Sequence, residues 1–234
     1  MAAPILISGA MDCEIDYFLE ELAGSTHRQI HGFDFWQGSL QGLPVVVSQT
    51  RVGMVAAAIA TAVGLSTYMP SAVINQGTAG GHRRDLKVGD IVIGRACVPI
   101  NGLEMPARSE GQGCAPLEWV PNHRTISHLS DRALCDLFAS TPYTGGQKRL
   151  GVLGCGDLFS REMDRIDWLH ATFGEDCEDM ETYAVQQACQ HFGVPFAGVR
   201  IISNNERTLD PYDRSTARTL QQFVCRALAD WPAH

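Results

Sequence analysis

The amino-acid sequence predicts one α/β domain built on a mostly parallel, buried sheet. Short β-branched runs alternate with helical segments along the chain, which is the pattern of successive βαβ units. The length of 234 residues suits one domain and no linker or internal repeat divides it, so we expect a single domain over residues 1–234. A composition of 45% hydrophobic and 19% charged residues excludes intrinsic disorder.

In the first half of the chain, expected strands and helices alternate. Residues 12–22 are expected to form a helix because their apolar side chains recur at helical spacing. An Ala-rich segment, 54–68, is expected to form a second helix that ends before Pro70. The expected strands are short apolar runs at residues 4–8, 45–48, 72–75 and 90–97.

The second half begins with a Pro- and Gly-rich stretch, 99–121, that we expect to be a long loop or lid. Residues 215–231 are expected to close the chain as a helix, with Ser215 as its N-cap. Gly193 and Pro195 separate a helix from the strand that follows it. The other expected elements are helices at 127–139 and 181–192 and strands at 150–153 and 196–202.

Charge and residue spacing exclude several kinds of partner. The chain has 26 acidic and 18 basic residues, a net charge of −8, so no nucleic-acid partner is expected. No run approaches the roughly 18 apolar residues of a membrane-spanning helix, so no membrane partner is expected. The eight cysteines form no CxxC pair and the eight histidines no HxxxH pair beside a carboxylate, so neither a metal nor a cofactor is expected. Without a recognisable signal peptide, we expect a cytoplasmic protein with reduced thiols.

Five polar segments follow or flank the expected strands. Open α/β sheets bind ligands at the carboxyl ends of their strands, so these segments are candidates for one site. Taken singly, each also fits a plain role, such as a glycine-rich tight turn or an acidic helix start. Arg200 lies in an apolar run and needs a partner for its charge, for which Glu14 or Glu181 would serve. The segments are 8–14, 75–81, 154–159, 178–181 and 199–206.

The order and spacing of these segments resemble the nucleoside phosphorylase superfamily, specifically the methylthioadenosine/S-adenosylhomocysteine nucleosidases. The resemblance covers nearly the whole chain and is weakest over residues 97–148. It implies a single-domain three-layer α/β sandwich with a mixed central sheet, of the nucleoside phosphorylase type, and a homodimer. The matching patterns are GAMxxE at 9–14, NxGSAGG at 75–81, LKVGDIV at 86–92, SGDxF at 155–159 and EMEaxA…vPF…vRxISD at 179–204.

The resemblance also implies a reaction and a set of roles. Water attacks the anomeric carbon of a purine nucleoside, and the base leaves through an oxocarbenium-like transition state. Glu14 matches the glutamate that activates the water, and Arg200 matches an arginine nearby. Glu181 matches the glutamate that binds the ribose hydroxyls, and Phe159 the aromatic ring that stacks on the base. The other implied substrate-binding residues are Val52, Thr78, Met180 and Ser203.

One catalytic position departs from the family pattern. Asn204 stands where the family has the aspartate that protonates N7 of adenine, and an amide cannot supply that proton. Loss of a general acid typically costs about 10²–10⁴-fold in rate. If adenine nucleosides are substrates, Asp12, Asn205 or a bound water must change the arrangement. Asparagine at this position also resembles superfamily members that prefer 6-oxopurines, such as trimeric purine nucleoside phosphorylases and futalosine-type hydrolases.

The leading hypothesis is therefore a nucleosidase that hydrolyses methylthioadenosine- or adenosylhomocysteine-type nucleosides. The first alternative is a 6-oxopurine nucleosidase acting on inosine- or futalosine-type substrates. A phosphorylase is disfavoured because Gln76 stands where hexameric relatives have an arginine, although Arg51 is an unexplained cation that keeps this option open. A non-catalytic nucleoside-binding protein is the last alternative, and Asn204 is its only support.

Overall fold

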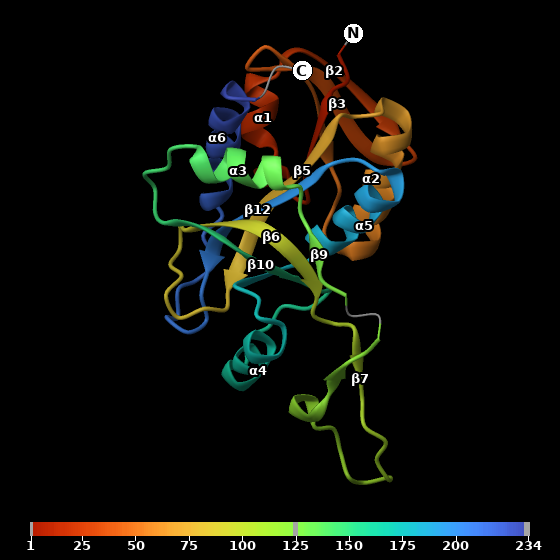
Figure 1. Cartoon of the computed structure of the whole chain (residues 1–234), viewed down its shortest axis with the longest axis vertical. Coiled ribbons are helices and arrows are strands. Elements are labelled where there is room, and N and C mark those ends of the chain that lie inside the picture. Colours follow the sequence, from red (N-terminus) through yellow and green to blue (C-terminus); the bar gives the residue numbers. More distant parts are fainter. Residues whose placement is uncertain (1, 124–125, 232–234) are drawn as a thin grey trace.

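A mixed β-sheet forms the centre of the fold. The computed structural model describes residues 2–123 and 126–231, whose strands form a ten-stranded sheet and a separate two-stranded hairpin, β7–β8 (Figure 1). The order in the large sheet is β11-β10-β6-β12-β5-β1-β4-β3-β2, and β9 pairs with β6. The strands are β1 (Ile5–Gly9), β2 (Ala23–Ile30), β3 (Phe33–Leu40), β4 (Leu43–Gln49), β5 (Ala72–Gly81), β6 (Ile91–Pro99), β7 (Leu103–Glu104), β8 (Val120–Pro121), β9 (His128–Leu129), β10 (Lys148–Cys155), β11 (Cys177–Asp179) and β12 (Phe196–Asn204).

Helices cover both faces of this sheet. They are α1 (Asp16–Glu21), α2 (Met54–Tyr68), α3 (Arg132–Ser140), α4 (Met163–Phe173), α5 (Thr182–Phe192) and α6 (Thr216–Ala229), with 3₁₀ turns η1 (Asp12–Glu14) and η2 (Pro116–Glu118). On one face α1, α3 and α6 bury Phe18, Phe138 and Phe223 in a shared apolar core, and on the other α2 packs against α5 (Figure 1). The predicted three-layer α/β sandwich with a mixed sheet is therefore confirmed.

The strands at the centre of the sheet bring the polar segments to one edge. β1 pairs in parallel with β4 and β5, and β5 pairs in parallel with β12, so their carboxyl ends lie together. β6 runs antiparallel to β12, which makes the sheet mixed. Because β11 pairs with both β10 and β5, the strands β5, β12, β6, β10 and β11 close into a small barrel.

The hairpin β2–β3 is absent from the sequence prediction. β2 is an exposed, polar edge strand, so it lacks the apolar alternation that marks a half-buried strand. Its hydrogen bonds to β3 form it instead. The two turns that flank β3, His31-Gly32 and Gln41-Gly42, have positive φ at both residues, as two-residue hairpin turns require. These X-Gly pairs, ten residues apart, are the signal that could have predicted the hairpin.

The glycine-rich segment 75–81 is not the tight turn that the sequence predicts. It continues β5 to Gly81, with β12 paired along one side and β11 along the other at Gly80 and Gly81. The local sequence alone does not show these two neighbours. α4 and β11 were also not predicted.

The expected helix over residues 12–22 is divided. A 3₁₀ turn, η1, is followed by Ile15 outside helical geometry and then by α1. The side chain of Gln221, from α6, satisfies the backbone groups at the break: it donates to the Cys13 carbonyl at 2.8 Å and accepts from the Tyr17 N–H at 2.9 Å. A tertiary contact therefore replaces the hydrogen bonds that a continuous helix would make.

Two other helix starts also differ from the prediction. α3 begins at Arg132 and not at residue 127, because the Asp131 side chain caps the Leu134 N–H at 3.0 Å. Ser215 does stand at the N-cap of α6, but its hydroxyl donates to Asp213 and makes no capping bond. The helices predicted over 54–68 and 181–192 are present, the second from Thr182.

Segment 99–121 extends away from the sheet and contains the hairpin β7–β8 and the turn η2 (Figure 1). Over the described part of the chain, no helix has the length and apolar character needed to cross a bilayer. In the same residues no three or more His, Cys, Asp or Glu side chains gather in a way that could hold a metal ion.

Candidate active site

A cavity opens at the carboxyl ends of β1, β5 and β12, where the polar segments meet. All the predicted substrate-binding residues line it, and so do Glu14 and Asn204. Arg200 does not line it, and neither does any residue of segment 99–121, all of which the structure describes, so the predicted lid does not cover this cavity. The main lining side chains are Met11, Glu14, Val52, Thr78, His82, Leu158, Phe159, Ser160, Ile166, Glu178, Asp179, Met180, Glu181, Ser203, Asn204, Glu206 and Tyr212.

The Glu14 carboxylate is fixed on the floor of the cavity. Its Oε2 accepts the N–H groups of Ala10 and Met11 at 2.8 and 3.2 Å, and its Oε1 accepts the N–H and hydroxyl of Thr78 at 2.8 and 3.0 Å. A Cβ at residue 77 would lie 2.8 Å from Oε1, so Gly77 is needed for this close approach. Four donors hold this buried side chain in one orientation, from which the carboxylate can orient a water and accept its proton.

Glu181 lies at the start of α5, facing the loop that contains Val52. Its Oε1 accepts the Gly53 N–H at 2.9 Å, which joins this carboxyl to the entrance of α2. Burial, and next the neighbouring charge of Asp179, raise the pKa of Glu181 to about 8. A buried carboxyl with so few partners is suited to bind hydroxyl groups of a ligand.

Arg200 supports the site from behind the cavity. Its Nε lies 3.2 Å from Oδ2 of Asp179, and both residues are buried. Its guanidinium also donates to the backbone and side-chain oxygens of Asn75. The expectation that Glu14 or Glu181 would pair with Arg200 is therefore wrong. Asp179 is the partner because β11, which was not predicted, brings its carboxylate within reach of Arg200 on β12.

Ser203 and Asn204, at the end of β12, also line the cavity. The Ser203 hydroxyl donates to Oδ1 of Asn204 at 3.0 Å and lies 3.2 Å from the Ala79 carbonyl. Among the described residues, none accepts a hydrogen bond from Nδ2 of Asn204, so this amide N–H₂ is available to a ligand. The side chain can therefore donate a hydrogen bond to a purine but cannot give it a proton.

The substitutes that the sequence offered for the missing acid lie outside the cavity. Asp12 is exposed and pairs with Arg214 at 2.7 Å. The Cys13 N–H and then Arg214 lower the pKa of Asp12, so it is a poor proton donor. Asn205 is buried, and its amide donates to the carbonyls of Arg83 and Leu86 at 3.1 and 2.9 Å. Neither Asp12 nor Asn205 is available to a base in this cavity.

The cations that would bind phosphate are also missing from the cavity. Its lining, within the part of the chain that the structure describes, contains five carboxylates and no Arg or Lys. Arg51 instead donates to the Gly32 carbonyl at 2.7 Å and lies over the ring of Phe33. Gln76 donates to the backbone carbonyl of Glu14. Arg51, the cation that the sequence left unexplained, thus packs against the hairpin β2–β3.

Sequence reasoning missed several residues of the cavity. Tyr212 lies at the mouth, where Phe159 is also 58% exposed, so two aromatic rings border the opening. Glu178, His82 and Ser160 gather deeper in the cavity, next to Gly80 and Gly81. The acidic run at 178–181 was a signal for Glu178, but no local pattern distinguishes an inward carboxylate from a solvated one.

Comparison with known proteins finds a matching family model and similar sequences. A family model described as the phosphorylase superfamily matches residues 4–229. The 5′-methylthioadenosine/S-adenosylhomocysteine nucleosidase of Tolumonas auensis is 32% identical over 208 residues, which cover 88% of this chain and 87% of that protein. The enzyme of the same name from Shewanella baltica is 33% identical over 216 residues, covering 88% and 86%.

Solved structures show the same fold. The Neisseria meningitidis 5′-methylthioadenosine/S-adenosylhomocysteine nucleosidase in complex with methylthio-immucillin-A superposes with a TM-score of 0.83 and 25% identity, covering 97% of this chain and 99% of that one. The futalosine hydrolase of Helicobacter pylori superposes with a TM-score of 0.83 and 24% identity, covering 98% and 99%. At that identity, the second likeness shows the fold alone.

Proposed function

The chain belongs to the phosphorylase superfamily, and we propose that it is a nucleosidase that hydrolyses the N-glycosidic bond of methylthioadenosine- and adenosylhomocysteine-type purine nucleosides. The observation that carries this proposal is the Glu14 carboxylate, buried and held by four donors at the floor of the cavity. A fixed carboxylate can activate water and stabilise a cationic sugar in the transition state. The nucleosidase relatives support the same reaction.

In this mechanism different residues contact the attacking water, the ribose and the base. Glu14 accepts a proton from the attacking water, whose oxygen bonds to the anomeric carbon. Glu181 binds the ribose hydroxyls, and Met180 lies against the sugar. Phe159 stacks on the base, and Asn204, oriented by Ser203, donates to N7. Arg200 acts indirectly, because it holds Asp179 and Asn75 in place.

Water, and not phosphate, is the attacking group in this proposal. Phosphate would have to enter a cavity whose described lining carries five carboxylates and no Arg or Lys. The carboxyl groups that are ionised repel an anion, and no cationic Arg or Lys in this lining offsets the repulsion. Arg51, the residue that kept phosphorolysis open, is engaged with Gly32 and Phe33.

The second candidate is a 6-oxopurine nucleosidase. One observation favours it: Oδ1 of Asn204 accepts from Ser203, so the side chain presents its N–H₂ to the base. An amide donor is complementary to the O6 and N7 acceptors of inosine- or futalosine-type substrates.

We also propose that residues 1–234 act as one domain in a cytoplasmic homodimer. Val52, Val55 and Ile59 expose 51%, 70% and 49% of their surface along the start of α2, beside the cavity. Such an apolar strip is suited to a second copy that would close the 5′ end of the site. The eight cysteines are all free thiols, which supports a reducing compartment. Size-exclusion chromatography with light scattering tests the dimer.

The activity is tested by following base release. The purified protein is incubated with methylthioadenosine, adenosylhomocysteine, inosine and futalosine, with and without phosphate. Free base without phosphate supports a nucleosidase, and the preferred substrate decides between the two candidates. Release that requires phosphate would establish a phosphorylase. Binding without release would establish a non-catalytic nucleoside-binding protein.

A further inference from the structure

The proposed site lacks an obvious source for the proton that an adenine base needs as it leaves. Asn204 cannot supply it, and Asp12 and Asn205 lie outside the cavity. A purine anion is a poor leaving group, so another acid in the cavity must protonate the base as it leaves. Carboxyl groups other than Glu14 and Glu181 must therefore be considered.

We propose that Glu178 is the general acid that protonates the departing purine, and that it recognises the adenine edge. This inference rests on the proposed nucleosidase function. Glu178 is buried at the centre of β11 and lines the cavity together with Asn204. Both Glu178 and Asn204 pair with the same residue of β5.

The strand register places these two side chains on either side of one glycine. Gly80, in β5, pairs with Glu178 on one side and with Asn204 on the other. Adjacent strands are about 4.8 Å apart, so the two backbones lie about 10 Å from each other across Gly80. A Cβ at residue 80 would lie 3.5 Å from Nδ2 of Asn204, so the Asn204 amide lies next to Gly80. A flat base in the cavity can contact Asn204 at one edge and Glu178 at the other.

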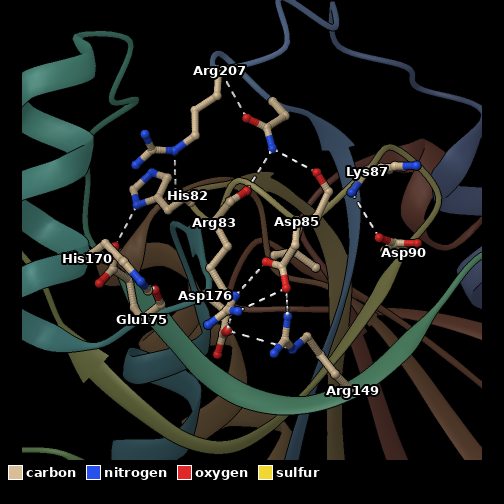
Figure 2. A network of polar contacts seen from close by, with 12 residues as sticks. His82, Arg83, Asp85, Lys87, Asp90, Arg149, His170, Glu175, Asp176 and Arg207 are labelled. Carbon is tan, nitrogen blue, oxygen red and sulfur yellow. Dashed lines mark hydrogen bonds and ion pairs between the residues drawn. The ribbon is translucent and has the colours of Figure 1, made fainter.

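The surroundings of Glu178 suit a group that holds and exchanges a proton. Its Oε2 lies 2.6 Å from the Ser160 hydroxyl and its Oε1 accepts the Ser160 N–H at 2.8 Å. Nε2 of His82 lies 3.7 Å from Oε2 of Glu178. Nδ1 of His82 lies 2.7 Å from Oε1 of Glu175, which is also buried (Figure 2). His82 therefore connects two buried carboxyl groups.

The charged groups that face Glu178 come from three different parts of the chain. His82 follows β5, Glu175 precedes β11, and Arg165 on α4 interacts electrostatically with Glu178. Burial is the main cause that raises the pKa of Glu178, and Glu175 adds to it, whereas His82 and the Ser160 hydrogen bonds oppose it. A carboxyl with a raised pKa keeps more of its acid form near neutral pH.

The proposed step balances as follows. The C1′–N9 bond breaks, and its electron pair goes to the purine. The Glu178 carboxyl gives its proton to N1, on the six-membered ring, so a neutral base leaves. The water oxygen bonds to C1′ and its proton passes to Glu14. Solvent then removes the proton from Glu14 and supplies a proton to Glu178, which lies next to His82.

The same carboxyl group can also bind the base. A protonated carboxyl has one O–H donor and one C=O acceptor, which match the N1 acceptor and 6-amino donor of adenine. With its two oxygens exchanged, it equally matches the N1–H donor and O6 acceptor of a 6-oxopurine. Only adenine, however, has an N1 that can receive the proton, so the proposed acid step serves adenine-type substrates.

The test compares Glu178→Gln with the parent enzyme and with Glu162→Gln. The control makes the same change at an exposed residue that also neighbours Arg165. Glutamine keeps the shape, its oxygen can still accept the Ser160 N–H and its N–H₂ can donate to the Ser160 hydroxyl, but it has no acidic proton. We expect kcat on methylthioadenosine to fall at least about 10²-fold with little change in KM, and the alkaline limb of the pH profile to disappear. Activity on 4-nitrophenyl riboside, whose leaving group needs no proton, is expected to change less than about threefold.

Two further variants keep the outcome decisive. Glu178→Asp retains an acid and is expected to recover part of the activity. Adding Asn204→Asp to Glu178→Gln is expected to restore release of adenine through N7. An unchanged kcat on methylthioadenosine, or an equal loss on both substrates in a folded variant, would overturn the role of Glu178 while leaving the nucleosidase intact. A parent enzyme inactive on every purine nucleoside would overturn the proposed function, and this inference with it.

Discussion

Thr78 holds the Glu14 carboxylate with two hydrogen bonds to the same oxygen: its N–H lies 2.8 Å and its hydroxyl 3.0 Å from Oε1. One residue of β5 thus fixes the carboxylate of Glu14, which lies in the turn η1 that follows β1. The two strands are parallel neighbours, and this pairing keeps the carboxylate in place before a substrate enters.

Glu14→Gln should lower turnover at least about 10²-fold, because the amide keeps the shape but cannot accept the proton of the water. The measurement is kcat on the best nucleoside substrate. Glu20→Gln is the matched control, since Glu20 is exposed and pairs with Arg218 far from the cavity. Full activity in the Glu14 variant would show that another group activates the water.

Glu181→Ala should raise KM and lower kcat together, because the ribose hydroxyls lose their partner in a buried position. For the same reason, 2′-deoxynucleosides should be poorer substrates for the parent enzyme. Steady-state kinetics on matched ribo- and deoxyribonucleosides check both effects. Equal rates on the two sugars would place the ribose away from Glu181.

Asn204→Asp should raise the ratio of kcat/KM for methylthioadenosine to that for inosine by about 10-fold or more, since it restores an acid beside N7. The Ser203 hydroxyl would still orient the new side chain. The ratio is measured in the parent and in the variant. A ratio that does not change, or that moves toward inosine, would mean that residue 204 does not face N7.

Arg200→Met should destabilise the folded protein by about 3–5 kcal/mol, because it leaves the buried Asp179 carboxylate without its cation. Denaturant unfolding measures the loss. Arg218→Met is the control, since its ion pair with Glu20 is exposed and its removal should leave the midpoint nearly unchanged. Equal midpoints for the two variants would show that the Arg200–Asp179 pair is not structural.

Local sequence patterns were sufficient for much of the fold. Apolar runs and helical spacing placed the strands around 4–8 and 196–202 and the helix over 54–68, because these elements bury a regular set of side chains. The polar edge strand β2 has no such pattern and was missed. Residues at the ends of parallel strands meet in space, which is why the motifs also identified most of the cavity.

The sequence by itself determined the α/β class, the family and the residues that converge on the cavity. Only the tertiary structure decided how deeply each of them is buried and which partners it has there. Asp12 and Glu14 are two residues apart, yet one is exposed beside Arg214 and the other is buried under four donors. Glu178 became a candidate acid only when β11 paired with β5. The physical reason is that burial and partners set the charge and reach of a polar side chain, and both come from strands distant in sequence.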